Sequence, residues 1–273
     1  LSDISVLGRH IANGYLARVS TCALREAAVT VISQARTRIG LLYSTQRVCD
    51  GAVLELTRTI WSFTYVCPAC REKMVYYDRL SPEGKQPKAC PSCGGLFERR
   101  KWPRGEDVPV EVVVVGQDGK LGAQPVCQFD LNMIAMAAED DRQREVPSLA
   151  IGQDREMYSR SGLGKAGLVQ TSLFFSPRNS IALLELWRAI DGVVDERVRQ
   201  KLRFAFTAIL PRASRRYQWS LQRPLNAQNQ TYYIAPVYYE WNVFGLFNRK
   251  VEASVRADEE LSGPDGGVVA ARA

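Results

Sequence analysis

The feature that most constrains this chain is a pair of motifs of the form Cys-Pro-x-Cys. Cys67 and Cys70 form the first motif, and Cys90 and Cys93 form the second, with nineteen residues between the two motifs. Each motif turns two thiolates toward one ion, so two motifs complete a tetrahedron. The spacing is typical of a zinc ribbon. The sequence therefore predicts a structural zinc site that is closed by four sulfurs and has no open position for catalysis.

Two other interpretations of these cysteines fit less well. Scattered core cysteines do not easily produce the paired spacing, and two separate redox motifs this close together would be unusual. The chain has seven cysteines, an odd number, and its first residues do not form a secretory signal. Both observations argue against a disulfide scaffold. We therefore expect a reducing, cytoplasmic environment.

The charge distribution favours an anionic partner. The net charge of +7 is only mildly basic, but residues 197–223 contain eight Lys and Arg and no Asp or Glu. Arg212, Arg215 and Arg216 lie there among Tyr, Trp, Asn and Gln, which is the mixture that contacts phosphates and base edges in DNA complexes. The alternative is that these cations lie on two solvated helices. No apolar run approaches the ~18 residues that span a bilayer, so we expect no membrane partner.

Two further polar residues are candidates for DNA contact. Arg178 and Asn179 follow Pro177 at the expected start of a helix. Free N–H groups at a helix N-terminus can bind an anion. His10, the only histidine, is expected to occupy an ordinary position on a helix, and its being alone excludes histidine-based catalytic triads and HExxH metal sites within this chain.

The hydrophobic periodicity predicts a mixed α+β fold class. The N-terminal part is helical, with Ser20 or Thr21 capping its second helix. An alternating, β-branched stretch then carries the cysteine motifs, and two amphipathic helices and an aromatic stretch follow a polar interval. We divide the chain into core helices at 1–50, a β-rich zinc-ribbon insertion at 51–137, a linker at 138–170, a helical and aromatic segment at 171–260, and a tail at 261–273.

Several stretches together resemble the zinc-ribbon-containing adenine-specific DNA methylases. In chain order these are SDISVLGRHIANGY, TIWSFTYVCPAC with CPSCGG, FFSPRNSIALLELWRAI, LRFAFTAILPRASRRYQW and YYIAPVYYEWNVFGLFNRKV. The resemblance implies a partial Rossmann-like methyltransferase that binds S-adenosylmethionine, with Asp3 matching the acid that holds the cofactor ribose. It also implies double-stranded DNA as partner, with other restriction or defence-system subunits as further candidate partners.

The sequence departs from this family at two motifs. The glycine-rich turn that precedes the ribose acid and the catalytic Asp-Pro-Pro motif are both missing. We therefore expect the central part of such an enzyme, which recognises DNA but is inactive alone and has no catalytic residue. Asp3 also has a simpler interpretation as a solvated helix cap.

Two other functions remain open from the sequence. A non-catalytic zinc-ribbon module that binds nucleic acid would show the same basic and aromatic segment. A zinc-stabilised protein-interaction domain would show the same cysteines without DNA affinity. The sequence also leaves open whether the parent enzyme would modify adenine N6 or cytosine N4.

Overall fold

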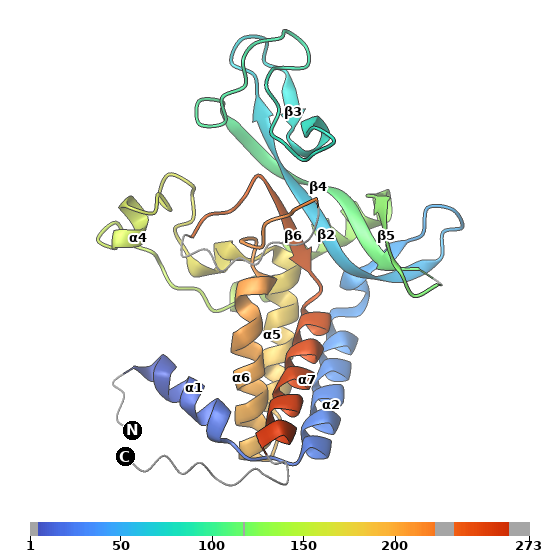
Figure 1. Cartoon of the computed structure of the whole chain (residues 1–273), viewed down its shortest axis with the longest axis vertical. Coiled ribbons are helices and arrows are strands. Elements are labelled where there is room, and N and C mark those ends of the chain that lie inside the picture. Colours follow the sequence, from blue (N-terminus) through green and yellow to red (C-terminus); the bar gives the residue numbers. More distant parts are fainter. Residues whose placement is uncertain (1–4, 117, 222–231, 262–273) are drawn as a thin grey trace. The chain divides into compact units, whose positions relative to one another are not determined.

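The computed structural model describes residues 5–116, 118–221 and 232–261. These residues form two compact units, one of helices and one built around a β-sheet (Figure 1). The helical unit contains residues 5–40, 181–210 and 243–261. The sheet unit contains the described residues of 41–180 and 211–242. The expected α+β class is therefore confirmed, and each unit is built from segments that are far apart in the sequence.

The helical unit is built from amphipathic helices. They are α1 (Val6–Leu16), α2 (Thr21–Ile39), α5 (Pro177–Asp191), α6 (Glu196–Ala213) and α7 (Val243–Leu261). Figure 1 shows the last four side by side, and α2 contacts α7. The predicted apolar stripes face the core, where Ile181, Ile190 and Leu202 are fully buried. Ser20 begins α2 as its cap, because its hydroxyl accepts the N–H of Ala23.

All strand pairs in the described residues are antiparallel. The strands are β1 (Ser44–Gln46), β2 (Val53–Val66), β3 (Lys73–Val75), β4 (Arg104–Val115), β5 (Leu121–Pro125) and β6 (Val237–Trp241). No α-helix lies between β1 and β5 in the chain, and short connections of this kind produce antiparallel neighbours. The parallel sheet of a Rossmann core is therefore absent from the described chain, and the Rossmann-like expectation is corrected there.

The strand β2 organises the sheet unit. The sequence predicts two short strands with a tight bend here, but β2 is one strand of fourteen residues that pairs with β1, β3, β4 and β6. Three irregularities in its register with β4 bend it without breaking it. Gln124 on β5 donates a hydrogen bond of 2.7 Å to the carbonyl of Gln46 on β1. The sheet therefore curls into an antiparallel half-barrel.

Short helical elements complete the sheet unit and its boundary. They are α3 (Gln128–Glu139), α4 (Glu156–Ser159), η1 (Gly40–Tyr43), η2 (Tyr77–Arg79), η3 (Asp141–Glu145) and η4 (Thr171–Phe174). The interval 138–170 is not the expected linker, because Ile151, Leu163 and Leu168 are buried in the aromatic core. None of the helices in the described residues combines the length and the apolar character needed to cross a bilayer.

Candidate metal centre and nucleic-acid interface

The four motif cysteines converge on one point beside the sheet. Their sulfur atoms all lie within 4.8 Å of one another, with 3.7 Å between Cys67 and Cys93 and 3.6 Å between Cys70 and Cys90. Four sulfurs that each lie ~2.3 Å from a zinc ion at the corners of a tetrahedron are ~3.8 Å apart. None of these cysteines forms a disulfide. The cluster therefore has the size and donor set of a structural zinc site, as the spacing predicts.

The two motifs share one backbone geometry. The N–H of Arg71 bonds to the carbonyl of Cys67 at 2.9 Å, and the N–H of Gly94 bonds to the carbonyl of Cys90 at 3.1 Å. Both donors are left-handed, with φ of 65° at Arg71 and 71° at Gly94. Each motif is thus a tight turn that closes one residue after its second cysteine. Glycine adopts this conformation at no steric cost, whereas a residue with a Cβ is strained.

The electrostatics of the cluster favour deprotonation at one sulfur. Backbone N–H groups of Cys93 and Ser92 point at Cys90 and lower the pKa of its thiol to about 7. Cys70 accepts the N–H of Glu72, which acts in the same direction, but burial and the neighbouring thiols outweigh it and raise its pKa to about 12. A bound cation reverses this second effect, since metal ligation deprotonates every coordinating thiol.

The matching turns give a paired prediction on stability. Gly94→Ala should lower the free energy of unfolding of the zinc-bound protein by about 1 kcal/mol, because the new Cβ enters a left-handed position. Arg71→Gly should leave it unchanged or raise it, because the existing strain is removed. Chemical denaturation of both variants measures this. A larger loss at Arg71 than at Gly94 would show that the arginine side chain, and not the backbone conformation, matters there.

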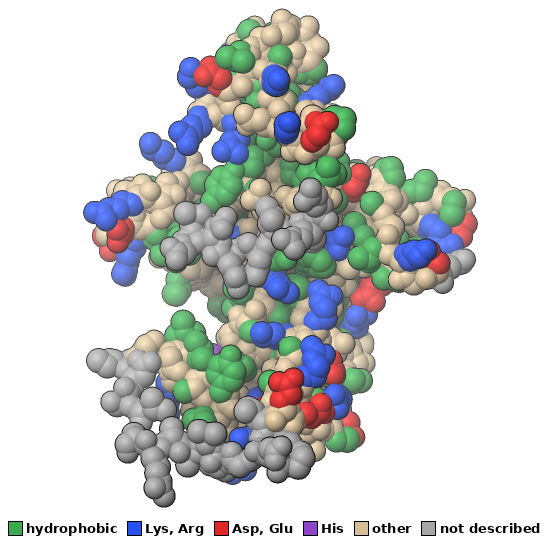
Figure 2. Space-filling view, in the orientation of Figure 1, with side chains coloured by type: hydrophobic (Ala, Val, Ile, Leu, Met, Phe, Trp, Pro, Cys, Tyr) green, Lys and Arg blue, Asp and Glu red, His purple; other side chains and the backbone are tan. Residues whose placement is uncertain are grey.

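The zinc site anchors a basic lobe. We call residues 67–104 the zinc lobe, which carries nine Lys and Arg against four Asp and Glu. Three of these cations bond to an acidic residue, and Arg99 donates to the hydroxyl of Tyr233 at 2.8 Å. The others are exposed and have no acidic partner among the described residues: Arg71, Arg79, Lys85, Lys88 and Arg100. Figure 2 shows Lys and Arg side chains gathered over the lobe, at the top of the view.

An aromatic strap borders the zinc lobe. We call residues 217–221 and 232–236 the strap; Tyr232 and Tyr233 in it are 37% and 47% exposed. Each of these two rings faces a guanidinium, with Arg216 5.1 Å from the Tyr232 centroid and Arg99 5.7 Å from the Tyr233 centroid. Exposed tyrosine rings beside arginines are suited to base stacking and phosphate contact.

The lobe and the strap enclose a groove of about 590 Å³. Leu80, Gly84 and Arg99 line it from the lobe, and Trp219 and Tyr233 line it from the strap. The ring of Trp219 is held by Tyr77, whose ring meets it edge-on at 5.4 Å. The sequence analysis missed Arg99 and Tyr233 because they are 134 positions apart, although the aromatic density of the strap was a usable signal.

The structure corrects the DNA role predicted for Arg178. Its side chain is 2% exposed and forms an ion pair with Glu240, which is 1% exposed. It also donates to the hydroxyl of Thr59 at 2.7 Å and to the carbonyl of Leu42 at 3.2 Å. Trp61 donates its indole N–H to the same carboxylate at 2.9 Å. Arg178 therefore joins the start of α5 to β2 and β6, and does not face a partner.

The DNA contact predicted for Asn179 is corrected for the same reason. Its side chain is buried, donates to the carbonyls of Ala213 and Trp241 at 2.8 and 3.1 Å, and accepts from the hydroxyl of Tyr43 at 2.6 Å. Ser176 accepts the backbone N–H of Asn179 and donates to Glu240. The Phe-Ser-Pro-Arg-Asn stretch is thus a structural clamp, since its polar atoms are used within the sheet unit.

In the structure, some cations of residues 197–223 have an acidic partner and others have none among the described residues. Arg212 is exposed with no acidic partner among the described residues, and Arg216 faces Tyr232 as described above. Arg215 pairs with Asp107 at 3.2 Å. Earlier in α6, acids neutralise the positive charge of three more cations: Glu196 of the same helix pairs with Arg199, whereas Asp258 and Asp191 pair with Lys201 and Arg203. Arg212 and Arg216 thus keep their predicted DNA role as a hypothesis, whereas the charge of Arg215 is already matched.

Two sequence candidates remain. Asp3, the expected ribose ligand, falls outside the described residues. His10 lies on α1, where its Nε2 is 2.8 Å from the hydroxyl of Thr207. This is the ordinary helical position that the sequence predicts.

Comparison with protein families, curated proteins and solved structures finds no match to this chain. Its function is therefore argued from its own residues.

Proposed function

We propose that this chain binds double-stranded DNA through the zinc lobe and the strap, as the target-recognition part of an S-adenosylmethionine-dependent DNA amino-methyltransferase. The observation that carries the DNA part is the set of exposed cations without acidic partners in the lobe that lines the groove, with the exposed ring of Tyr233 on its other side. Zinc holds this surface together, and the surface contacts the nucleic acid.

Phosphate binding follows from the unneutralised charge of the lobe. Each cation that meets a phosphate releases a counterion from the duplex, which makes affinity fall steeply with salt. Cations that already pair with a carboxylate contribute little to this effect, because their charge is matched before binding. Five exposed cations are available, together with Arg99 beside Tyr233 and Arg212 in the last turn of α6: Arg71, Arg79, Lys85, Lys88 and Arg100.

The methyltransferase part of the proposal is supported by the ordered sequence resemblance. In this proposal Asp3 holds the cofactor ribose, and the catalytic motif belongs to another part of the enzyme. The acceptor is an exocyclic amine, adenine N6 or cytosine N4. Calorimetry with S-adenosylmethionine on the complete enzyme tests this part. Absence of binding there, with DNA affinity retained, would favour the second candidate, a non-catalytic zinc-ribbon module that binds nucleic acid.

The DNA interface makes a quantitative prediction. The triple variant Lys85→Ala/Lys88→Ala/Arg100→Ala should bind a duplex at least about tenfold more weakly at low salt, and its plot of log affinity against log salt should be shallower by about 3. Arg212→Ala should reduce the slope by about 1. Fluorescence anisotropy with a labelled duplex at several salt concentrations measures both effects.

Arg18 provides a matched control for these substitutions. It is an exposed arginine of the helical unit with no acidic partner among the described residues. Arg18→Ala should leave duplex affinity and its salt dependence unchanged. If the triple variant binds like the unaltered protein, the lobe is only a solvated surface, and the zinc-stabilised protein-interaction function becomes the better interpretation.

A further inference from the structure

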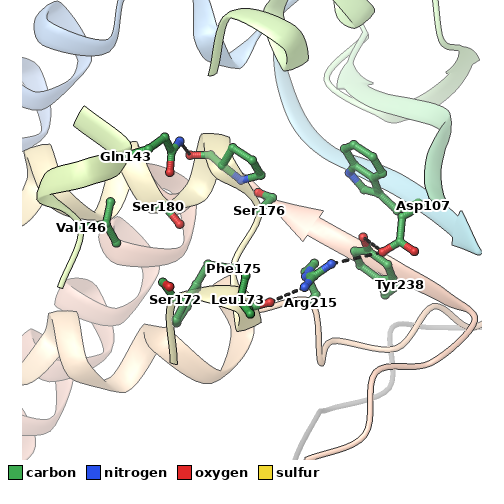
Figure 3. A pocket seen from close by; sticks show the side chains of 12 residues that line it. Asp107, Gln143, Val146, Ser172, Leu173, Phe175, Ser176, Ser180, Arg215 and Tyr238 are labelled. Atoms are coloured by element: carbon green, nitrogen blue, oxygen red, sulfur yellow. Dashed lines mark hydrogen bonds and ion pairs between the residues drawn. The ribbon is translucent and has the colours of Figure 1, made fainter. Parts of the chain in front are cut away.

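A second pocket in the sheet unit is separate from the groove. It has a volume of about 310 Å³ and lies beside the start of α5, in the view of Figure 3. Its apolar lining comes from two aromatic rings and three aliphatic side chains: Trp61, Phe175, Val146, Leu173 and Pro177. A volume at the lower limit of roughly 300–1,000 Å³ for ligand sites suits a small ligand, and this lining suits one with an apolar body.

One end of this pocket carries more positive than negative charge. Asp107 accepts from Arg104 at 2.6 Å and from Arg215 at 3.2 Å, so two guanidiniums share one carboxylate. Neither arginine has a second acidic partner among the described residues. The carboxylate matches one of the two charges, and one positive charge remains. Figure 3 shows Arg215 joined to Asp107 at this end of the pocket, with Gln143 and Val146 at the other end.

The neighbouring groups do not cancel this positive charge. Tyr238 donates its hydroxyl to Asp107 at 2.9 Å. Burial, together with the charge of Asp107, raises the pKa of Tyr238 well above its usual value, so the phenol stays neutral. Glu240, which two lining side chains contact, already forms an ion pair with Arg178. The pocket therefore favours an anion over a neutral ligand or a cation.

Two further features at the pocket favour an anion. Nε of Arg215 is buried and has no hydrogen-bond partner among the described residues, whereas the terminal nitrogens of the same guanidinium donate to Asp107 and to the carbonyl of Leu173. A poorly solvated guanidinium is stabilised by a second negative charge beside it. The pocket also lies at the N-terminus of α5, a helix of fifteen residues, where the macrodipole places a partial positive charge.

We infer that this pocket binds a small organic carboxylate, with its charge at the Arg215 end and its apolar body against the aromatic and aliphatic lining. One remaining positive charge matches a monoanion. A carboxylate carries one negative charge at pH 7, whereas a phosphate monoester carries about 1.5–2. The same chemistry is present in a free acid and in the C-terminal carboxylate of a peptide. The inference does not depend on the proposed duplex interface, because no residue that lines the groove lines this pocket.

The test titrates the full chain at pH 7 with benzoate, 3-methylbutanoate and N-acetylphenylalanine, followed by saturation-transfer NMR and calorimetry. Each acid is compared with its own primary amide, which keeps the shape of the acid and removes the charge. Dimethyl phosphate, a monoanion without a carboxylate, is titrated in parallel. We expect saturable binding of at least one acid, with its amide at least about tenfold weaker. Binding of benzoate or 3-methylbutanoate identifies a site for free acids, and binding of N-acetylphenylalanine alone identifies a site for a peptide C-terminus.

Three variants place the binding in the pocket, and two of them should change affinity in opposite directions. Arg104→Gln removes the remaining positive charge at a residue that does not line the pocket, and should weaken carboxylate binding at least about threefold. Asp107→Asn removes the negative charge and should strengthen binding by a similar factor. Val146→Trp fills the pocket and should abolish binding. Circular dichroism and thermal unfolding establish that each variant is folded.

Lys120→Gln is the matched control for the change in net charge. Lys120 is an exposed cation of the same sheet unit and does not line the pocket. This variant loses one positive charge, as Arg104→Gln does, and should bind the carboxylate as the unaltered protein does.

Four results would overturn the inference. The first is the absence of saturable binding of every acid by the unaltered protein, and the second is an amide that binds as tightly as its acid. The third is dimethyl phosphate binding more tightly than every acid. The fourth is carboxylate binding that neither Arg104→Gln nor Val146→Trp weakens. Affinity for duplex DNA, measured on the unaltered protein, reports separately on the proposed interface, so failure of one proposal is distinguishable from failure of the other.

Discussion

Cys90→Ser should reduce the zinc content from one ion per chain to none and unfold the zinc lobe. Cys90 is buried, and its sulfur is the one that the backbone N–H groups of the second motif favour as a thiolate. A serine hydroxyl is a much poorer zinc ligand than a thiolate. Structural zinc contributes on the order of 10 kcal/mol to the folding of a small module, which exceeds the stability of most domains. Metal analysis of protein purified with reductant, together with hydrogen exchange, measures both losses.

The loss should be confined to one part of the chain. Backbone amide exchange should become fast in the zinc lobe, including at Phe97 and Trp102, whose rings meet edge-on at 4.9 Å. The amides of α2 and α7 should remain protected. Cys49→Ser is the matched control, because Cys49 is an exposed free cysteine outside the cluster. It should retain one zinc per chain. A full zinc complement in Cys90→Ser would contradict the assignment of the metal centre.

The second large effect is expected at the buried ion pair. Glu240→Gln should lower the free energy of unfolding of the sheet unit by about 3–5 kcal/mol, because it leaves the Arg178 guanidinium buried without a counter-charge. Water cannot solvate the charge of Arg178 in place of Glu240, because the arginine side chain is only 2% exposed. Denaturant unfolding followed by tryptophan fluorescence measures this loss, and Trp61, which donates to the same carboxylate, contributes to the signal.

An exposed pair supplies the comparison. Lys73 and Glu106 also form an ion pair, but their side chains are 52% and 68% exposed. Exposed pairs contribute ~0–1 kcal/mol, so Glu106→Gln should change stability little. Equal losses in the two variants would mean that the charge of Glu240 does not matter and that the buried site accepts a neutral amide.

The same pair makes stability depend on pH. Burial alone would raise the pKa of Glu240, but Arg178 and the hydrogen bonds from Ser176 and Trp61 outweigh it and lower the pKa below its ordinary value. A lowered folded-state pKa contributes stability above the unfolded value of ~4.3, and this contribution disappears as the pH falls through the folded value. Glu240→Gln should therefore lose less additional stability than the unaltered protein when the pH is lowered below about 4.

The sequence was sufficient to predict the features that depend on residues close together in the chain. The spacing of two cysteine motifs predicts the sulfur cluster, and Ser20 predicts the start of α2, because each depends on residues a few positions apart. The DNA role of Arg178 was wrong because its partner, Glu240, lies 62 positions away. The sequence cannot show that a cation is paired when its acidic partner is distant in the chain and is brought close only by tertiary structure. The prediction for Arg215, which pairs with Asp107, failed for the same reason.

The prediction of a linker at 138–170 failed for a different reason. Its composition is polar, which predicts a linker, but three apolar residues within it, Ile151, Leu163 and Leu168, reach the aromatic core. Composition averages over a segment, whereas packing depends on a few positions that the surrounding sheet makes available. The pocket beside α5 was equally hidden, because its lining comes from parts of the chain as distant as Trp61 and Tyr238.

The continuity of β2 links chemically unrelated sites mechanically. The strand ends at Val66, directly before the first zinc ligand, and Thr59 within it receives the hydrogen bond from the buried arginine. At about 3.3 Å per residue, these points are ~25 Å apart along a single backbone. One continuous strand, bent at two register irregularities, therefore connects the first zinc ligand to the residue that accepts from the buried arginine.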